Sequence, residues 1–272
     1  MVEAFIEAIA ISKPSKSNKA NFMKSTLPNF FEFQPSKDLI RIGRDNDGGY
    51  LVVEEDVIHS EVLIGLGIND DWSFEEDFTK WKDVPVLAFD ASVNKKVFFR
   101  KILKNLVRVD SPGNVLHWLK VYSSYNHFFS GSHRHIEKFV GLRYGDRHIT
   151  MEEVFEETPS GSIFLKIDIE GSEYRILDCL LSNQNRISGM VIEFHDCDLH
   201  LERIEGFLEK FALRLVHIHA NNYAPLEKGN GLPLVLELTF SRYASVQKNI
   251  ILPHPLDMPN DSLNEEIHLR FE

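Results

Sequence analysis

The sequence predicts an α/β fold with a mostly parallel seven-stranded sheet, an antiparallel last strand and helices on both faces. Apolar runs of strand length recur along the chain, and helix-period segments separate most of them, which is typical of βαβ units. The last two runs are joined by a Gly/Asn/Pro loop too short for a good helix, so the final strand should be antiparallel. A chain of 272 residues that is 43% hydrophobic can bury one large core.

Residues 1–36 are expected to form an N-terminal helical arm and linker, and residues 37–272 the α/β domain. The arm holds an amphipathic helix candidate, a Lys/Ser-rich linker "SKPSKSNKAN" and the segment "FMKSTLPNFFEF", whose aromatic residues should dock on the domain. The domain begins with "LIRIGRDNDGGYLVVEED", in which Asp and Gly at the centre predict a β-hairpin turn. A calcium loop is disfavoured there because the distal Glu is missing. Asp47 and Tyr50 of this hairpin are candidates for lining the cleft.

The remaining elements follow in order. The predicted strands are "EVLIGLG", "PVLAFDAS", "HIEKFVGL", "SIFLKIDIEG", "GMVIEFHD", "LRLVHIHANN" and the closing run in "LPLVLELTFSR". Predicted helices include "VNKKVFFRKILKNL", "SEYRILDCLLSNQ" and "HLERIEGFLEKFA". In such sheets ligands bind beyond the carboxyl ends of the strands, so the site is sought there.

Composition narrows the partners and the compartment. A net charge of -11 argues against nucleic acid as the main partner. Cys179 and Cys197 show neither metal-ligand nor redox spacing, which fits a reduced, cytoplasmic setting. Glu3 and Glu7 interrupt the apolar N-terminus, so we expect no signal peptide, no membrane span and no membrane partner. Homo-oligomer formation is left open.

The loops after the first two sheet strands predict a nucleoside-bearing cofactor. Gly65, Leu66, Gly67 and Asn69 would let the backbone approach a ligand closely, but the third glycine of a dinucleotide motif is absent, and acids at the next helix would repel a pyrophosphate. The second strand ends in Asp90, followed by Ala91 and Ser92, and Asp90 could accept both ribose hydroxyls of an adenosine. A tight turn and a helix cap are the structural alternatives. Together the two loops suggest S-adenosylmethionine.

The fourth strand ends in Asp168 and Glu170, with Glu173 beyond a glycine. Side chains alternate along a strand, so Asp168 and Glu170 should point the same way over the crevice. Glu173 falls in the first turn of the next helix, where the helix dipole favours a negative charge. For Asp168 and Glu170, capping of backbone N–H groups remains an alternative to ligand binding or catalysis.

This region resembles the FkbM family of S-adenosylmethionine-dependent methyltransferases, whose motif K-x-D-[IV]-E-G-x-E is matched by Lys166, Asp168, Ile169, Glu170, Gly171 and Glu173. The upstream "HITMEEVF" is similar to the family's T-L-[DE]-[DE] helix, and the resemblance extends over about residues 40–242. The chain departs from the family in having "GLGIND" in place of D-x-G-A-N and an extra aromatic stretch at 113–131. The resemblance implies a Rossmann-like class I methyltransferase fold and methyl transfer to an oxygen, commonly on a sugar or secondary metabolite.

The expected acceptor side lies at the ends of the later strands. His195 is the predicted general base, with Asp168 and Glu170 beside it, because an imidazole can take a proton from the attacking hydroxyl near neutral pH. Glu170, His195, His219 and Asn221 are the predicted residues for binding a small-molecule or glycan acceptor, and Asp168 also faces the cofactor. Asp168, Glu170, His195 and His219 could form a metal site, but without diagnostic spacing we expect turnover without a metal.

Other interpretations stay open. A nicotinamide-dependent oxidoreductase would need the missing glycine motif, and a non-catalytic binding module on a degenerate methyltransferase fold would lack a usable cleft. The stretch 113–131, which contains Trp118, Tyr122, Tyr125 and Phe128, is expected to be core or to form a lid over the acceptor.

Overall fold

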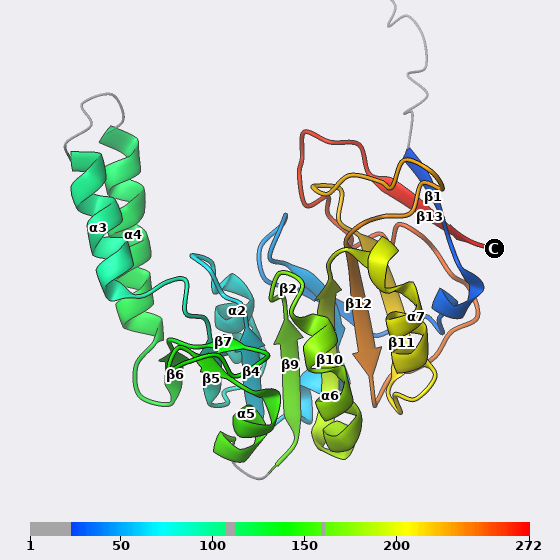
Figure 1. The fold of residues 1–272 in the computed structure, drawn as a ribbon, viewed down its shortest axis with the longest axis horizontal. Helices are drawn as coiled ribbons and strands as arrows, with labels where there is room; N and C mark the ends of the chain where they lie inside the picture. Colours follow the sequence, from blue (N-terminus) through cyan, green and yellow to red (C-terminus); the bar gives the residue numbers. More distant parts are fainter. Residues whose placement is uncertain (1–22, 107–111, 159–160) are drawn as a thin grey trace, which may run out of the picture.

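The computed structural model describes residues 23–106, 112–158 and 161–272 (Figure 1). A seven-stranded sheet forms its centre, in the order β11-β12-β10-β9-β4-β5-β6. The strands of this sheet are β4 (Val62–Leu66), β5 (Val86–Phe89), β6 (His133–Ile136), β9 (Ile163–Ile167), β10 (Ile187–Phe194), β11 (Arg214–Ala220) and β12 (Leu236–Ser241). All pairs are parallel except those of β12, which runs antiparallel to β10 and β11. The predicted fold class and its antiparallel strand are confirmed.

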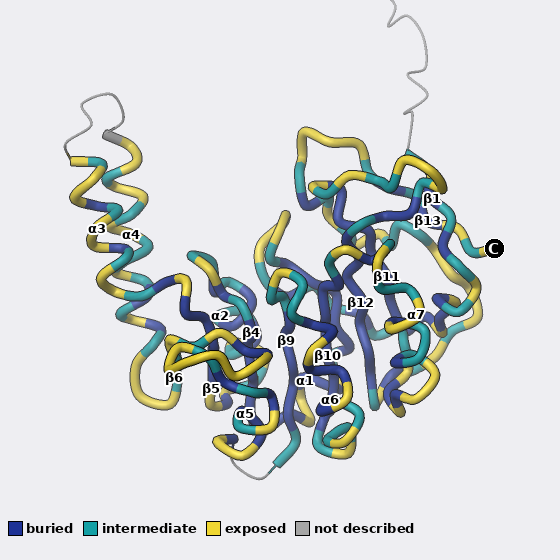
Figure 2. The backbone as a smooth tube through the Cα atoms, in the orientation of Figure 1, coloured by how far each residue is buried: buried dark blue, intermediate teal, exposed yellow. Residues whose placement is uncertain are grey.

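Helices cover both faces of the sheet. They are α1 (Glu54–Ile58), α2 (Ser73–Trp81), α3 (Lys95–Leu106), α4 (Pro112–Phe128), α5 (Met151–Glu157), α6 (Leu177–Asn183) and α7 (Cys197–Leu208), with 3-10 turns η1 (Asn29–Phe31), η2 (Glu173–Arg175) and η3 (Gln184–Arg186). Because side chains alternate along a strand, Leu165 packs in the core under α5, α6 and α7, whereas its neighbour Phe164 packs in the core under α1 to α4. The central strands β4, β9 and β10 are accordingly buried along their whole length (Figure 2).

Three short pairings flank the central sheet. The hairpin of β2 (Leu39–Ile42) and β3 (Tyr50–Val53) forms as predicted around the D-N-D-G-G turn. β7 (Phe139–Val140) pairs with β8 (His148–Ile149). β1 (Met23–Leu27) pairs in parallel with β13 (Ile267–Phe271), a contact between the two ends of the described chain that no local sequence pattern indicated.

The aromatic segment that precedes the domain docks on its core. Phe31 and Phe33 are buried in the same cluster as β9 and β10, so these residues contribute to the core of the domain. The predicted amphipathic helix and the Lys/Ser-rich linker lie outside the described residues. Within the part of the chain that the structure describes, no helix is both long and apolar enough to cross a membrane.

The stretch 113–131 forms most of α4, which pairs with α3 as a hairpin beyond the edge of the sheet at β5 and β6 (Figure 1). Tyr125 and Phe128 are buried in the core beneath this hairpin, in agreement with the expectation that the stretch contributes to the core. No residue of the described hairpin lines the cavity at the carboxyl ends of β4 and β9. A lid over the acceptor is therefore not formed in this conformation.

Candidate active site

A cavity of about 550 Å³ opens at the carboxyl ends of β4, β5 and β9. Of the predicted cofactor residues, five line it: Gly67, Asn69, Asp90, Ser92 and Asp168. The turn between β2 and β3 closes one side with Arg44, Asp47 and Gly48. Gly65, Leu66 and Ala91 are not part of the lining and lie behind it.

The glycine loop, residues 65–69, packs closely against the end of β9. Gly67 has φ +78°, and a Cβ there would lie 1.7 Å from the carbonyl oxygen of Asp168, so only glycine fits. Gly65 serves a different purpose, since its missing side chain leaves room for Glu75, whose Oε1 would be 2.4 Å from a Cβ. Leu66 is fully buried in the core. The loop therefore brings bare backbone to the cavity at Gly67 but not at Gly65.

Asp90 organises the two loops that meet at the cavity. Its Oδ2 accepts the backbone N–H groups of Ile68 at 3.1 Å and Asn69 at 2.8 Å, and its Oδ1 accepts that of Ser92 at 2.6 Å. The capping position of α3 is instead filled by Asn94, whose side chain accepts the N–H of Val97. Asp90 is thus a loop organiser that also faces the cavity, and the alternative of a helix cap is wrong.

The end of β9 delivers its carboxylates to one place. Glu173 is fully buried at the start of η2, where its Oε1 accepts the N–H of Ile169 at 3.0 Å. Asp168 lines the cavity, and its Oδ2 lies 3.5 Å from Nζ of Lys166. Glu170 stands in the left-handed region at φ 52° and is mostly exposed. Glu173 lies in the first turn as expected, but its side chain accepts an N–H of the preceding loop rather than capping the turn. Asp168 and Glu170 have no backbone N–H partners among the described residues.

His195, at the end of β10, lies at the centre of these acids. Its Nδ1 lies 3.2 Å from Oε1 of Glu173, which fixes the orientation of the ring. Its Nε2 is surrounded by three carboxylates, those of Glu170 at 3.5 Å, Glu193 at 3.7 Å and Asp168 at 3.9 Å. The predicted trio of Asp168, Glu170 and His195 is therefore brought together, with two further acids.

This setting keeps His195 charged. Burial alone would lower its pKa, but the hydrogen bond to Glu173 and the surrounding carboxylate charges outweigh burial and raise the pKa to about 9. At neutral pH only about one ring in a hundred is then unprotonated. A general base needs the unprotonated form, so the pKa argues against His195 as the base near neutrality. Burial, helped by neighbouring acids, also raises the pKa of Glu193 well above its ordinary value.

The same cluster has the donor set of a metal site. Asp168, Glu193 and His195 each offer one ligand atom, and these atoms lie within 4.8 Å of one another. Carboxylate and imidazole ligands would suit Mg²⁺, Mn²⁺ or Zn²⁺. The protonated ring of His195 places a positive charge among these carboxylates, as a bound metal ion would.

Two residues that were predicted to bind the acceptor are buried and contact other side chains instead of the cavity. His219 is buried between Glu237 and Glu266, with both ring nitrogens 3.0 Å from a carboxylate oxygen. Asn221 is buried as well, and its Nδ2 donates to Oε1 of Glu193 at 2.9 Å. Neither side chain lines the cavity, so direct acceptor binding by them is not supported. The sequence showed that they reach the rim but not that partners would enclose them.

Two charged residues at the cavity had no predicted role. Lys166 is buried and donates to the carbonyl oxygen of Gly67, which ties β9 to the glycine loop. Glu75 of α2 is 1% exposed, and its Oε1 has no hydrogen-bond partner among the described residues. Burial raises the pKa of Glu75 to about 7, against the opposing charge of Lys166. The alternation rule places Lys166 beside Asp168, but nothing local shows that Glu75 turns inward.

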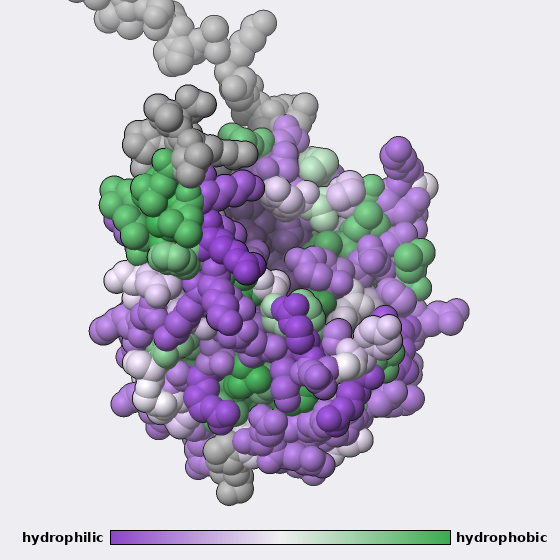
Figure 3. All heavy atoms as spheres, turned by 60° about the vertical axis from the view of Figure 1, so that its left-hand side comes forward, coloured by the Kyte–Doolittle hydropathy of each residue, from purple (hydrophilic) through white to green (hydrophobic). Residues whose placement is uncertain are grey.

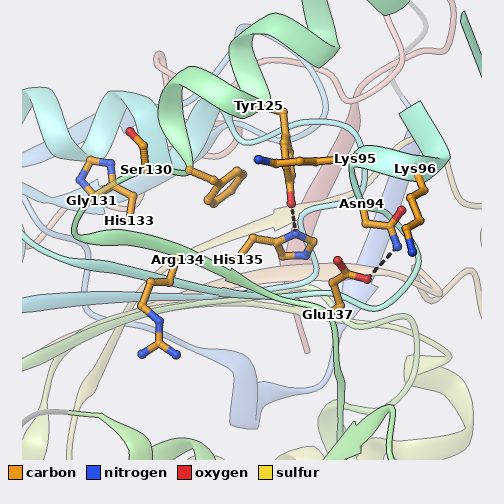
Figure 4. A pocket seen from close by; sticks show the side chains of 11 residues that line it. Asn94, Lys95, Lys96, Tyr125, Ser130, Gly131, His133, Arg134, His135 and Glu137 are labelled. Carbon is orange, nitrogen blue, oxygen red and sulfur yellow. Dashed lines mark hydrogen bonds between the residues drawn. The ribbon is translucent and has the colours of Figure 1, made fainter. Parts of the chain in front are cut away.

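A second cavity of about 550 Å³ lies at the base of the α3–α4 hairpin (Figure 4). Several of its polar groups are already paired, with Tyr125 Oη 2.6 Å from Nδ1 of His135 and Asn94 donating to Glu137 at 2.7 Å. It contains neither the glycine loop nor the acids that follow β9. We therefore assign the candidate site to the first cavity.

Comparison with known proteins agrees with this architecture. The model of the methyltransferase FkbM domain matches residues 69–215, more than half of the chain. A search of curated proteins gives no significant match. Similar solved structures include a precorrin-6y C5,15-methyltransferase from Geobacter metallireducens GS-15 (13% identity, 70% of this chain and 87% of that chain covered, TM-score 0.38). An rRNA methylase from Streptococcus thermophilus is another (11% identity, 70% and 94% covered, TM-score 0.35).

The structure thus combines an open, mostly parallel sheet, with one antiparallel strand next to its edge, and a cavity at the carboxyl ends of β4, β5 and β9. The family model shows that the chain belongs to the FkbM methyltransferase family.

Proposed function

We propose that the protein uses S-adenosylmethionine to methylate a hydroxyl group of a small molecule or glycan. The single observation that carries this proposal is the cavity in which the glycine loop, the end of β5 and Asp168, the residue after β9, meet. The adenosine would lie by Asn69, Asp90 and Ser92, and the sulfonium near the carboxylate of Asp168. Acidic groups suit a cationic methyl donor and would repel a pyrophosphate.

The acceptor would approach from the side of His195. Its oxygen attacks the methyl carbon opposite the sulfur, so a C–O bond forms while the C–S bond breaks and its electron pair returns to sulfur. The hydroxyl proton passes to a carboxylate, for which Asp168 is the candidate because it lines the cavity and has no backbone donor. Imidazolium His195, whose Nε2 lies 3.9 Å from Oδ1 of Asp168, would hold this carboxylate in place from behind the cavity lining. This revises the expected base from His195 to Asp168.

Titration calorimetry with S-adenosylmethionine and, separately, with NAD tests the cofactor. We expect saturable binding of S-adenosylmethionine alone, and binding of NAD alone would indicate an oxidoreductase. The second step is a panel of hydroxyl acceptors assayed for methyl transfer.

Two variants then separate the roles at the acceptor end. Asp168→Asn and His195→Ala should each lower the single-turnover rate by roughly a hundredfold or more. His195→Ala should leave the affinity for S-adenosylmethionine nearly unchanged, since His195 does not line the cavity. A His195→Ala protein that turns over at the parental rate would remove this residue from the mechanism.

A further inference from the structure

The α3–α4 hairpin carries an unusual concentration of exposed apolar side chains. Those of α3 lie at i, i+4 and i+7 on one face, and two more follow on α4: Phe99 (51% exposed), Leu103 (47%), Leu106 (60%), Leu116 (57%) and Leu119 (46%). They form the green patch on the hairpin in Figure 3. No described part of the chain covers this face. Exposed patches of this kind mark interaction surfaces.

The hairpin is also the most cationic part of an acidic protein. Its described helices contain no Asp or Glu and six cationic residues: Lys95, Lys96, Arg100, Lys101, Lys104 and Lys120. Lys96, Arg100 and Lys104 recur every four residues, on a stripe next to the apolar one, and form no ion pair with any described residue. Against a net charge of -11 for the whole chain, this segregation makes the hairpin attractive to an anionic surface.

The hairpin stands on the same side of the sheet as the mouth of the cavity. It rises beside the carboxyl ends of the strands (Figure 1), and Lys101 pairs with Asp70 of the loop that follows β4. Beyond the cavity, on the side of β11, Leu263 is 91% exposed and Tyr223 is 74% exposed. The side chain of Asn222, which follows β11, donates to the carbonyl oxygen of Asp261. This bond holds the segment that carries Leu263 at the carboxyl end of β11. Apolar side chains therefore flank the cavity on two sides.

We propose that this face docks on an anionic lipid bilayer, with the apolar stripe of the hairpin inserted between headgroups and its cations on the lipid phosphates. The proposal replaces the expectation, drawn from the N-terminal sequence, that the protein has no membrane partner. Interleaved Leu, Phe, Lys and Arg on one helix face are the chemistry of interfacial membrane binding. A nucleic acid would use the cations but leave the Leu and Phe side chains in water. A symmetric contact with a second copy would bring the same cations face to face.

Docking would turn the mouth of the cavity towards the lipid headgroups. An acceptor would then be reached at the membrane surface, a consequence that rests on the proposed function. The docking itself does not, because vesicle binding needs neither cofactor nor turnover. If the protein does not bind vesicles, the proposal of methyl transfer still stands. If the protein transfers no methyl group, the proposal of membrane docking still stands.

The experiment is flotation of the full chain with vesicles of pure phosphatidylcholine and with vesicles that also contain phosphatidylglycerol. We expect binding only to the anionic vesicles. Arg100→Gln combined with Lys104→Gln should lower the partition coefficient roughly twenty-five-fold, because each cation contributes about fivefold. Leu103→Ser combined with Leu116→Ser should lower it at least about tenfold. Because these side chains are exposed, the variants should keep the parental circular dichroism and melting temperature.

Matched controls lie at the opposite end of the sheet. Lys82→Gln combined with Lys210→Gln removes two cations there, and Ile58→Ser removes an apolar side chain that is 41% exposed. Both controls should bind vesicles like the parent. The proposal is overturned if the parent floats with neither kind of vesicle, or if the hairpin variants bind as well as the controls. It is also overturned if the parent ignores vesicles but forms a dimer that Leu103→Ser dissociates, or binds RNA instead.

Discussion

Replacing Asp90 perturbs the cofactor end of the cavity through defined hydrogen bonds. Asp90→Ala removes the acceptor of three backbone N–H groups, at 3.1, 2.8 and 2.6 Å. The N–H of Ile68 is buried and would lose its partner, which costs about 2 kcal/mol, whereas Asn69 and Ser92 can turn to water. We expect a free energy of unfolding lower by about 2–3 kcal/mol.

The same change should weaken S-adenosylmethionine binding by at least about tenfold, because the disordered loop loses its fit and the ribose loses an acceptor. Titration calorimetry on the folded variant measures the affinity, and urea unfolding measures the stability. Asp83→Ala, an exposed site before the other end of β5, is the matched control and should change neither quantity. An unchanged affinity in folded Asp90→Ala would refute the assignment of this loop to the cofactor.

Three further predictions follow from particular contacts. Burial raises the pKa of Asp56 to about 7, so the folded state binds a proton more tightly than the unfolded state. The free energy of unfolding should therefore be highest below about pH 4 and should fall as the pH rises towards 7. Asp56→Asn should therefore raise the free energy of unfolding at pH 8 by up to about 4 kcal/mol but change it little at pH 4, as chemical denaturation would show. Gly67→Ala should abolish cofactor binding in calorimetry because its Cβ would overlap the carbonyl oxygen of Asp168, whereas Gly206→Ala, with open space around it, should bind normally. A chelator should leave methyl transfer intact; loss of activity that Mg²⁺ or Mn²⁺ restores would show that the acid cluster holds a metal.

The elements of the sheet could be predicted because their signals are local. The runs that became β4, β5, β9 and β10 are mostly apolar, as is typical of strands buried on both faces. The antiparallel β12 followed from the loop before it. The pairing of β1 with β13 joins segments more than two hundred residues apart, and no local pattern encodes such a contact.

The sequence could predict which residues of the candidate site come together, because the carboxyl ends of parallel strands meet at one edge of the sheet. That rule brought Asp168, Glu170 and His195 together correctly. It could not predict protonation, because the pKa of His195 depends on Glu173 and Glu193 as neighbours in space. It also could not distinguish an exposed rim residue from His219, which two acids enclose.

The most direct test of the account is the pH dependence of single-turnover methyl transfer, once the panel has supplied an acceptor. If a carboxylate such as Asp168 takes the proton while imidazolium His195 holds the site, the rate should stay level from about pH 7 to 8 and fall as His195 loses its proton near pH 9. His195→Ala should remove that fall along with most of the rate. A parental rate that instead rises about tenfold per pH unit from 7 towards 9 would show that neutral His195 is the base and contradict the account.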